Sequence, residues 1–250
     1  MGNLAGRVAM ITGGGSGIGR ATALIMAGRG ADIAVVDLNG VGAEETAARV
    51  RALGRRALVF AIDVSDGAAV RAAGAKTEAE WGAIDILCNN AGIASDRRPV
   101  EEVTEEFFDR QIAVHAKGAL FATQAAVPGM KRRRYGKIVN TSSVNGTVGF
   151  QNCGAYNAAK GALLAMAKGW AKEFAPWNIA VNVVAPGEVM TPMPMAHDSP
   201  ELMARIAETI PLKRYAQPEE IGYAIAYLCS PEADFVTGQV LSPNGGAVIT

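Results

Sequence analysis

The feature that most constrains the fold is a glycine-rich run between a strand-like segment and a helix-like segment. Residues Gly13–Gly19 read Gly-Gly-Gly-Ser-Gly-Ile-Gly, directly after the apolar run Arg7–Thr12 and at the start of the helix-like segment Ile18–Arg29. Glycines permit a tight turn and let backbone N–H groups approach a pyrophosphate, which the N-terminus of the following helix also attracts. This context predicts the first unit of a nucleotide-binding α/β domain.

The following sequence repeats this alternation of short apolar runs and longer helix-like segments. The apolar runs show little polar alternation, which is typical of strands buried on both faces of a parallel sheet. The predicted strands are Arg7–Thr12, Asp32–Asp37, Ala57–Ile62, Ile84–Cys88, Lys137–Ser142 and Ile179–Val184. The predicted helices are Ile18–Arg29, Ala43–Leu53, Ala68–Trp81, Glu105–Met130 and Ala155–Phe174. The rhythm predicts an α/β, Rossmann-like doubly wound parallel sheet with right-handed crossovers and helices on both faces.

The chain's 250 residues favour one domain spanning 1–250. Half of the residues are apolar and 19% are charged, which supports one large core, and no linker-like stretch divides the sequence. The least regular part is Gly187–Pro200, with three prolines and three methionines. We expect a mobile loop there, followed by a short helix to about Ile210, and together they would form a substrate loop or lid around residues 187–210.

Composition excludes several classes of partner. The formal net charge is zero, so no global field attracts nucleic acid or an anionic membrane, and the basic cluster Lys131–Arg134 is interpreted as a solvated helix end. The N-terminal residues lack the features of a signal peptide, and no apolar run reaches the ~18 residues of a membrane span. Three widely separated cysteines indicate neither a disulfide framework nor a metal site. We expect a cytoplasmic protein without a metal.

An acidic residue ends the second predicted strand. Asp37 lies at the spacing from Gly19 at which a carboxylate accepts both ribose hydroxyls of an adenosine, although a strand-end turn is the plainer interpretation. A 2′-phosphate would meet like charge there, and no Arg or Lys adjoins Asp37. We therefore expect NAD rather than NADP. Asp63 and Val64, after the third predicted strand, are candidates for contact with the adenine amino group, with an ordinary turn as the alternative.

A tyrosine and a lysine supply candidate acid/base chemistry. Tyr156 and Lys160 lie four residues apart in a helix-like segment, which places both on one face. A phenol with a pKa of about 10 is a poor proton donor or acceptor at neutral pH, and a neighbouring ammonium favours its phenolate. Ser143, after the preceding predicted strand, would hydrogen-bond a reacting oxygen at the edge where ligands bind. Taken alone, such a Tyr/Lys pair usually consists of exposed side chains without a catalytic role.

Five short motifs occur in order along the chain: Thr12-Gly13-x-x-x-Gly17-Ile18-Gly19, Asn89-Asn90-Ala91-Gly92, Ser143, Tyr156-x-x-x-Lys160 and Pro186-Gly187-x-Val189-x-Thr191. In this order and spacing they resemble the motifs of the classical short-chain dehydrogenases/reductases, over essentially the full length of the chain. The resemblance implies an NAD(H)-dependent oxidoreductase that transfers a hydride between the nicotinamide and a secondary alcohol or ketone. It also implies a homotetramer, often with the Glu105–Met130 and Ala155–Phe174 helices in its interfaces.

The resemblance assigns roles to these positions. Tyr156 would be the acid/base, Ser143 would orient the substrate oxygen, and Lys160 would hold the nicotinamide ribose and lower the pKa of the tyrosine. Asn89 would stabilise the central strand. Together with the glycine turn and the two acidic positions, the expected cofactor-binding residues are Gly13, Ser16, Gly17, Ile18, Gly19, Asp37, Asp63, Val64, Asn90, Gly92, Tyr156, Lys160, Pro186, Gly187, Val189 and Thr191. Among them, Ile18 would pack near the nicotinamide, and Val189 and Thr191 would contact its carboxamide.

One position departs from the family's pattern. Where family members usually carry an Asn in a kinked helix, this chain carries His115. In the family, the backbone carbonyl of that Asn holds a water in a proton relay from the lysine. Three hypotheses follow for His115: the backbone relay is retained, the imidazole joins the relay because it titrates near neutrality, or the relay is impaired or rerouted.

The substrate pocket is expected to mix apolar and polar groups without a dominant charge. Its candidate residues are Ser143, Val144, Asn145, Cys153, Tyr156, Glu188 and Met193, with Met195 and His197 as further candidates. Glu188 would contact a polyol or an amine, or is simply a solvated loop acid. Cys153 is interpreted as pocket wall because no activating base is evident.

Two alternatives to the NAD-linked alcohol/ketone oxidoreductase stay open. The first is a 3-oxoacyl thioester reductase that uses NADPH, against which Asp37 argues. The second is a dinucleotide-binding protein without catalysis, which the substitution at His115 would permit and the intact Ser143, Tyr156 and Lys160 oppose.

Overall fold

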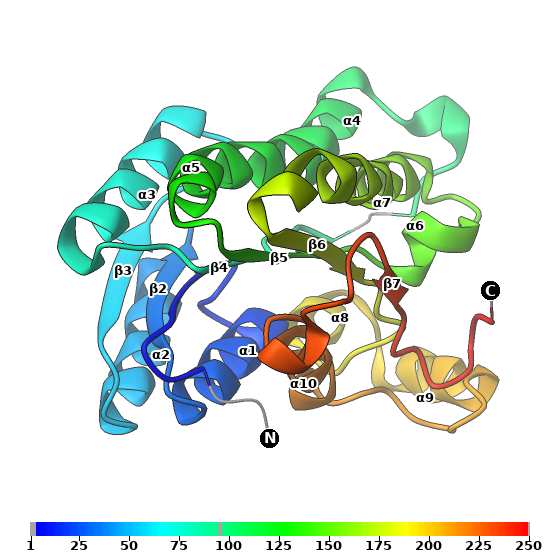
Figure 1. Cartoon of the computed structure of the whole chain (residues 1–250). Helices are drawn as coiled ribbons and strands as arrows, with labels where there is room; N and C mark the ends of the chain where they lie inside the picture. The colour runs from blue at the N-terminus through cyan, green and yellow to red at the C-terminus, as the bar shows by residue number, and fades with distance from the viewer. Residues whose placement is uncertain (1–3, 95–96, 250) are drawn as a thin grey trace.

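The computed structural model describes residues 4–94 and 97–249, and these residues form a seven-stranded parallel sheet with helices on both faces (Figure 1). The strands are β1 (Val8–Thr12), β2 (Asp32–Asp37), β3 (Ala57–Ala61), β4 (Ile86–Asn89), β5 (Gly136–Thr141), β6 (Ile179–Val184) and β7 (Val240–Leu241). Their order is β3-β2-β1-β4-β5-β6-β7, and every pairing is parallel. The order reverses between β1 and β4, and ligands bind at such a reversal in doubly wound sheets. The predicted fold class is confirmed.

The helices divide between the two faces of the sheet. Their bounds are α1 (Gly17–Gly28), α2 (Gly40–Ala52), α3 (Gly67–Trp81), α4 (Glu105–Ile112), α5 (Gly118–Arg133), α6 (Val144–Val148), α7 (Gly154–Phe174), α8 (Pro192–His197), α9 (Pro200–Thr209) and α10 (Pro218–Leu228). Helices α1, α2 and α10 pack on one face, and α3, α5 and α7 on the other (Figure 1). Among the described helices, none combines the length and apolarity that a membrane crossing requires.

Local chemistry explains where several helices begin and end. Asp66 precedes α3, and its carboxylate accepts hydrogen bonds from the backbone N–H groups of Ala68 and Ala69. Gly82 ends the same helix with a φ of 80°, in the left-handed region that a glycine adopts without a Cβ clash. Thr104 caps α4 through the N–H of Phe107. The sequence therefore sets these helix limits through side chains and glycines next to them.

The segment expected as one helix, Glu105–Met130, is divided by a single π-helical stretch. Helices α4 and α5 flank Ala113–Lys117, and His115 lies at the centre of this π-helical stretch. A π-bulge inserts an extra residue into the helical turn and frequently marks a functional site. The basic cluster at the end of α5 is a helix end, as expected, although Arg132 and Arg133 pair with Glu78 rather than standing alone.

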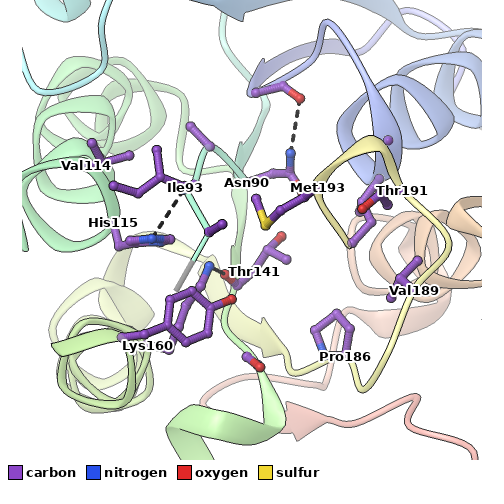
Figure 2. Close-up of a pocket in the computed structure, with 18 of the residues that line it drawn as sticks. Asn90, Ile93, Val114, His115, Thr141, Lys160, Pro186, Val189, Thr191 and Met193 are labelled. Atoms are coloured by element: carbon purple, nitrogen blue, oxygen red, sulfur yellow. Dashed lines mark hydrogen bonds between the residues drawn. The ribbon is translucent and has the colours of Figure 1, made fainter. Parts of the chain in front are cut away.

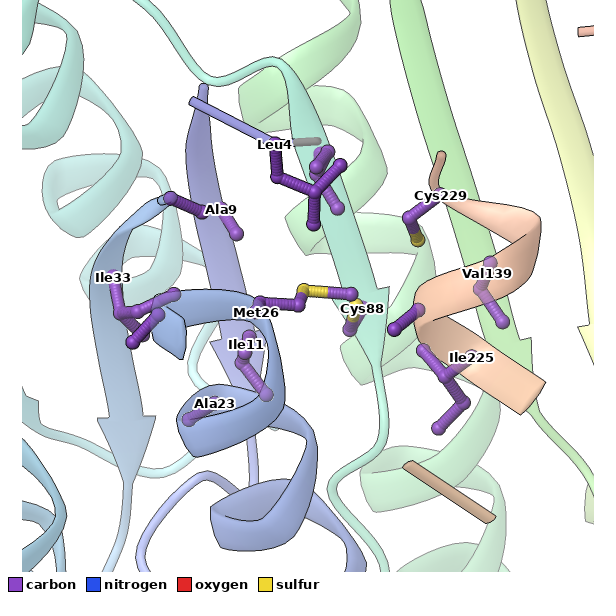
Figure 3. Packing of buried hydrophobic residues seen from close by; sticks show 14 of the residues in the cluster. Leu4, Ala9, Ile11, Ala23, Met26, Ile33, Cys88, Val139, Ile225 and Cys229 are labelled. Carbon is purple, nitrogen blue, oxygen red and sulfur yellow. The ribbon is translucent and has the colours of Figure 1, made fainter. Parts of the chain in front are cut away.

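Two apolar cores fill the layers. The first lies between the sheet and helices α1, α2 and α10, and Figure 3 shows Met26 and Cys88 near its middle, with Ile33 and Ile225 on either side. The second lies between the sheet and helices α3, α5 and α7. Both sheet faces are thus buried, which explains the near-continuous apolar strands.

Helix α10, which the strand–helix pattern of the first half does not reach, contributes to the first core through Ile225, a fully buried side chain. Ile225→Ala should lower the free energy of unfolding by about 2–4 kcal/mol, because it removes apolar contacts and leaves a cavity. Urea denaturation followed by circular dichroism measures this loss. Val41→Ala is the control, since Val41 is 74% exposed on α2 and its truncation should change stability by less than about 0.5 kcal/mol. Equal stability of both variants would contradict the packing.

Candidate active site

A cavity of about 450 Å³ runs along the carboxyl ends of the strands. It gathers most of the residues that the sequence analysis selects, and Figure 2 shows its two sides, with His115 and Lys160 facing Pro186, Val189 and Thr191. The selected residues that line it are Gly13, Ser16, Gly17, Ile18, Asp37, Asp63, Val64, Asn90, Gly92, His115, Ser143, Val144, Asn145, Cys153, Tyr156, Lys160, Pro186, Gly187, Glu188, Val189, Thr191 and Met193.

Two selected residues lie elsewhere. Gly19 is buried at the start of α1, where an added Cβ would collide with the carbonyl oxygen of Gly13, so it permits close packing of helix against turn rather than contact with a ligand. Met195 is 63% exposed and does not line the cavity. The side chain of His197 lies outside the described part of the chain.

The ends of β1 and β4 are joined by a compact set of hydrogen bonds. The Thr12 hydroxyl donates to the carbonyl of Cys88 and accepts from the N–H groups of Asn90 and Ala91, at 3.0 and 3.1 Å. The Asn90 amide donates to the carbonyls of Thr12 and Gly13, at 3.1 and 3.2 Å (Figure 2). Asn90 therefore holds the glycine turn in place as well as lining the cavity.

The glycine turn depends on residues without side chains. Gly13 has a φ of 64°, and a Cβ there would lie 2.8 Å from the Cα of Ala91. Gly17 has a φ of 47°, and a Cβ there would lie 3.1 Å from a Thr191 methyl group. A larger residue at either position would push the turn away from its neighbours and close space at the N-terminus of α1.

Asp37 faces this turn from the end of β2. One carboxylate oxygen accepts from the N–H of Gly15 at 2.8 Å, and the other accepts from the N–H of Asn39 at 2.8 Å. The nearby Arg20 is occupied, since its guanidinium donates to the carbonyls of Gly15 and Gly42 and to Glu45. The carboxylate is thus fixed in direction, and this arginine is engaged elsewhere.

Asp63 lines the same end of the cavity but has partners of its own. Its carboxylate accepts from Ser65 and forms an ion pair with Arg110 at 3.0 Å. Burial raises the pKa of Asp63, but the bonds from Ser65 and Arg110 outweigh it and lower the pKa overall. The sequence did not indicate that Arg110 would pair with Asp63, because only the fold brings α4 next to the end of β3.

Ser143, Tyr156 and Lys160 all line the cavity. Ser143 precedes α6, and Tyr156 and Lys160 lie on α7. Burial raises the pKa of Tyr156 to about 12, although a hydrogen bond with Ser143 lowers it in part. The expected lowering of this pKa by Lys160 is absent from this structure, because burial dominates at the phenol.

Lys160 is itself altered by burial. Its ammonium nitrogen donates to the carbonyl of Thr141 at 2.9 Å and lies 5.6 Å from the centre of the Tyr156 ring. Burial lowers the pKa of Lys160 to about 7, since the charged form loses hydration. At neutral pH the lysine therefore exchanges readily between its charged and neutral forms, which suits a group that passes protons.

His115 is a buried neighbour of both groups. Its Nε2 accepts from the N–H of Ile93 at 3.3 Å (Figure 2), and its ring meets that of Tyr156 edge to face with centroids 5.3 Å apart. Burial, with a further contribution from Lys160, lowers the pKa of His115 well below its usual range. This direction opposes the hypothesis that the imidazole joins the relay by titrating near neutrality, because the charged ring would be desolvated beside Lys160.

A chain of amides supports Ser143 from behind. The Ser143 hydroxyl donates to the side-chain carbonyl of Asn145 at 3.3 Å, and the Asn145 amide donates to Asn157 at 3.2 Å. The Asn157 amide in turn donates to the carbonyl of Phe150 at 2.8 Å. The sequence did not indicate a role for Asn157, and only its position directly after Tyr156 could have suggested one. The chain fixes the direction in which the serine hydroxyl points.

Comparisons with known proteins identify the family and agree with the fold. A family model described as enoyl-(acyl carrier protein) reductase matches residues 13–248. The 3-oxoacyl-[acyl-carrier-protein] reductase FabG of Thermotoga maritima is 40% identical over 247 residues, covering 98% of this chain and 99% of the relative. The chain belongs to the classical short-chain dehydrogenase/reductase family, and it is an oxidoreductase by that membership.

Other relatives carry different substrates in their names. The cis-4-hydroxycyclohexanecarboxylate dehydrogenase of Sinomonas cyclohexanicum is 39% identical over 240 residues, covering 96% of each chain. The crystal structure of an NAD⁺-bound xylitol dehydrogenase superposes with a TM-score of 0.91 at 32% identity, covering 97% of this chain and 99% of that one. The family is therefore established, whereas the relatives differ in substrate.

The charge of His115 is open to a direct measurement, because the chain has only two histidines. Between pH 8 and pH 5, imidazole ¹⁵N spectra of His115 should keep the shifts of a neutral ring with its proton on Nδ1, since Nε2 accepts the bond from Ile93. The His115→Asn variant assigns the signal by removing it. A ring that gains a proton with a pKa near 6.5 would contradict the burial and the bond direction.

Proposed function

We propose that this chain is an NAD(H)-dependent oxidoreductase that interconverts secondary alcohols and ketones, with Tyr156 as its acid/base. The observation that carries the proposal is that Tyr156, Ser143 and Lys160 line the same cavity as the glycine turn and Asp37. One end of the cavity offers groups suited to a dinucleotide, and the other offers groups suited to a proton transfer.

The residues present fit NAD. The glycine turn leaves space beside backbone N–H groups that a Cβ would fill, and Asp37 is oriented by Gly15 and Asn39 to accept the ribose hydroxyls. Lys160 would hold the nicotinamide ribose, and Val189 and Thr191 would contact the carboxamide at the far side of the cavity. When bound, the nicotinamide supplies the acceptor or donor of the hydride.

The protein's own residues manage the proton. Ser143 and Tyr156 bind the substrate oxygen, with the serine hydroxyl oriented by Asn145. With its pKa raised to about 12, Tyr156 carries its proton in the free protein at neutral pH and is ready to give it to a ketone oxygen. In the oxidation direction the phenol first gives its proton to neutral Lys160, which has a pKa of about 7 and passes the proton to solvent, and the resulting phenolate then accepts the hydroxyl proton of the alcohol.

His115 acts on this route through its position rather than its charge. The ring packs against Tyr156 and also lies against Gly92, where an added Cβ would lie 2.7 Å from the imidazole. Of the hypotheses for His115, this arrangement favours a relay through the backbone of the π-helical stretch. A rerouted relay stays the alternative.

The Tyr156→Phe variant tests the acid/base assignment. We expect turnover to fall by about 10²–10⁴-fold, the range over which a positioned proton donor acts, while NAD⁺ binds within about threefold of the parent. Steady-state rates at 340 nm and calorimetric titration measure the two quantities. Tyr223→Phe serves as the control, because this tyrosine is 55% exposed on α10. Turnover of the Tyr156→Phe variant close to that of the parent would overturn the assignment.

The Asp37→Asn variant tests the cofactor. Loss of the charge should lower the affinity for NAD⁺ by about 10- to 100-fold, since hydrogen bonds to a charged group contribute about 1.5–3 kcal/mol. It should also reduce the preference for NAD⁺ over NADP⁺. The ratio of kcat/KM for the two cofactors measures this. Glu44→Gln removes an exposed carboxylate that pairs with Arg51 and should leave the ratio unchanged. A parent enzyme that prefers NADP⁺ would reject the assignment to NAD.

A second candidate is a 3-oxoacyl thioester reductase, which the similarity to the Thermotoga maritima reductase favours. Asp37 opposes its expected NADPH dependence. Acetoacetyl-CoA reduction with NADPH, compared with oxidation of secondary alcohols by NAD⁺, separates the two. A dinucleotide-binding protein without catalysis would turn over neither, and the intact Ser143, Tyr156 and Lys160 argue against it.

The closing and assembly of the enzyme also stay predictions. We propose that the segment around residues 187–210, which contains α8 and α9, closes over the substrate. The family resemblance implies a homotetramer, which size-exclusion chromatography with light scattering tests. The sequence also leads us to expect a cytoplasmic location and a single domain.

A further inference from the structure

Beyond Tyr156, the cavity continues into an end where charged side chains gather. Arg97, Glu188 and Asp198 all line this end. Of the three, Glu188 lies next to residues expected to contact the cofactor, and its neighbour Val189 is buried in the first core. Glu188 therefore lines the same cavity as Ser143 and Tyr156.

The backbone around Glu188 is fixed by hydrogen bonds. The Glu188 carbonyl accepts from the N–H of Ala216 at 3.0 Å, and the N–H of Met190 donates to the Ala216 carbonyl at 2.8 Å. On the other side, the N–H of Gly187 donates to the carbonyl of Pro243 at 3.2 Å. A side chain held on such a segment is better placed to recognise a ligand than one on a free loop.

Glu188 is exposed where it lines the cavity, and its carboxylate lacks a protein partner. Among the described residues, no side chain or backbone N–H forms a hydrogen bond or an ion pair with it. A carboxylate accepts hydrogen bonds and donates none, so this one is free to accept a hydrogen bond from a ligand in the cavity.

A second unpartnered oxygen lies in the same neighbourhood. The Tyr215 side chain is only 4% exposed, and its hydroxyl has no hydrogen-bond partner. Burial is the largest cause of the raised pKa of Tyr215 and of Tyr156, and the charge of Glu188 raises both further. Tyr215 does not itself line the cavity, which Glu188 shares with Ser143 and Tyr156. Cys153 and Met193 supply the apolar wall of this cavity.

We propose that Glu188 forms a subsite for a second hydroxyl group of the substrate, so that the preferred substrates are diols and the matching hydroxyketones. This inference rests on the proposed function. The reacting carbon would lie at Ser143 and Tyr156, and the Glu188 carboxylate would accept a hydrogen bond from the hydroxyl on a neighbouring carbon.

A pair of matched substrates tests the subsite. Cyclohexanol and 1,2-cyclohexanediol differ by one hydroxyl, and kcat/KM for each is measured with NAD⁺ and with NADP⁺. We expect the parent to prefer the diol by about 10- to 100-fold, as for a hydrogen bond to a charged acceptor. Glu188→Leu should reduce this preference to about twofold or less. Glu188→Gln, which keeps a carbonyl acceptor, should retain part of it.

The control is Glu219→Gln, which removes an exposed charge from α10, outside the 187–210 segment, and should leave the preference for the diol as in the parent. A parent that oxidises cyclohexanol without preferring the diol, or a Glu188→Leu variant that keeps the preference, overturns the subsite alone. A preference for 2-aminocyclohexanol over the diol that depends on Glu188 overturns the hydroxyl assignment. If neither alcohol is oxidised with either cofactor, the proposed function fails, and the subsite fails with it.

Discussion

The junction between the carboxyl ends of β1 and β4 is the constraint on which the site depends. At this point the two strands are adjacent but their following segments diverge, which leaves backbone groups in need of partners. The Thr12 hydroxyl and the Asn90 amide supply those partners, and they bind the backbone of Cys88, Ala91 and Gly13. Because the glycine turn starts at this junction, the hydrogen bonds of the junction fix the shape of the dinucleotide end of the cavity.

Most of the fold was predictable because strands buried on both faces of a parallel sheet appear in the sequence as continuous apolar runs. The runs Arg7–Thr12 and Asp32–Asp37 are apolar along nearly their whole length, and the structure has strands there. The seventh strand, Val240–Leu241, has only two residues and carries no periodic signal. The π-helical stretch Ala113–Lys117 could not be predicted either. Its residues are equally compatible with an ordinary α-helix, and only the packing around His115 distinguishes it.

The site was predictable where spacing and topology alone decide which groups meet. A four-residue separation on one helix placed Tyr156 beside Lys160, and parallel strands brought Asp37 to the same edge. Contacts between distant segments were not accessible in this way. The ion pair of Asp63 with Arg110 and the amide chain through Asn157 depend on where α4 and α7 pack, which no local pattern records.

Burial, rather than spacing, sets the charges of the reacting groups. Spacing alone predicts that the Lys160 ammonium lowers the pKa of Tyr156, but removing both groups from water opposes each charged form. The outcome is a neutral phenol, a neutral imidazole at His115 and a lysine near its midpoint at pH 7. His115 and Lys160 both lie close to Gly92, and the proximity of the lysine lowers the pKa of His115 further. Any further loss of water from the cavity therefore shifts all three equilibria together.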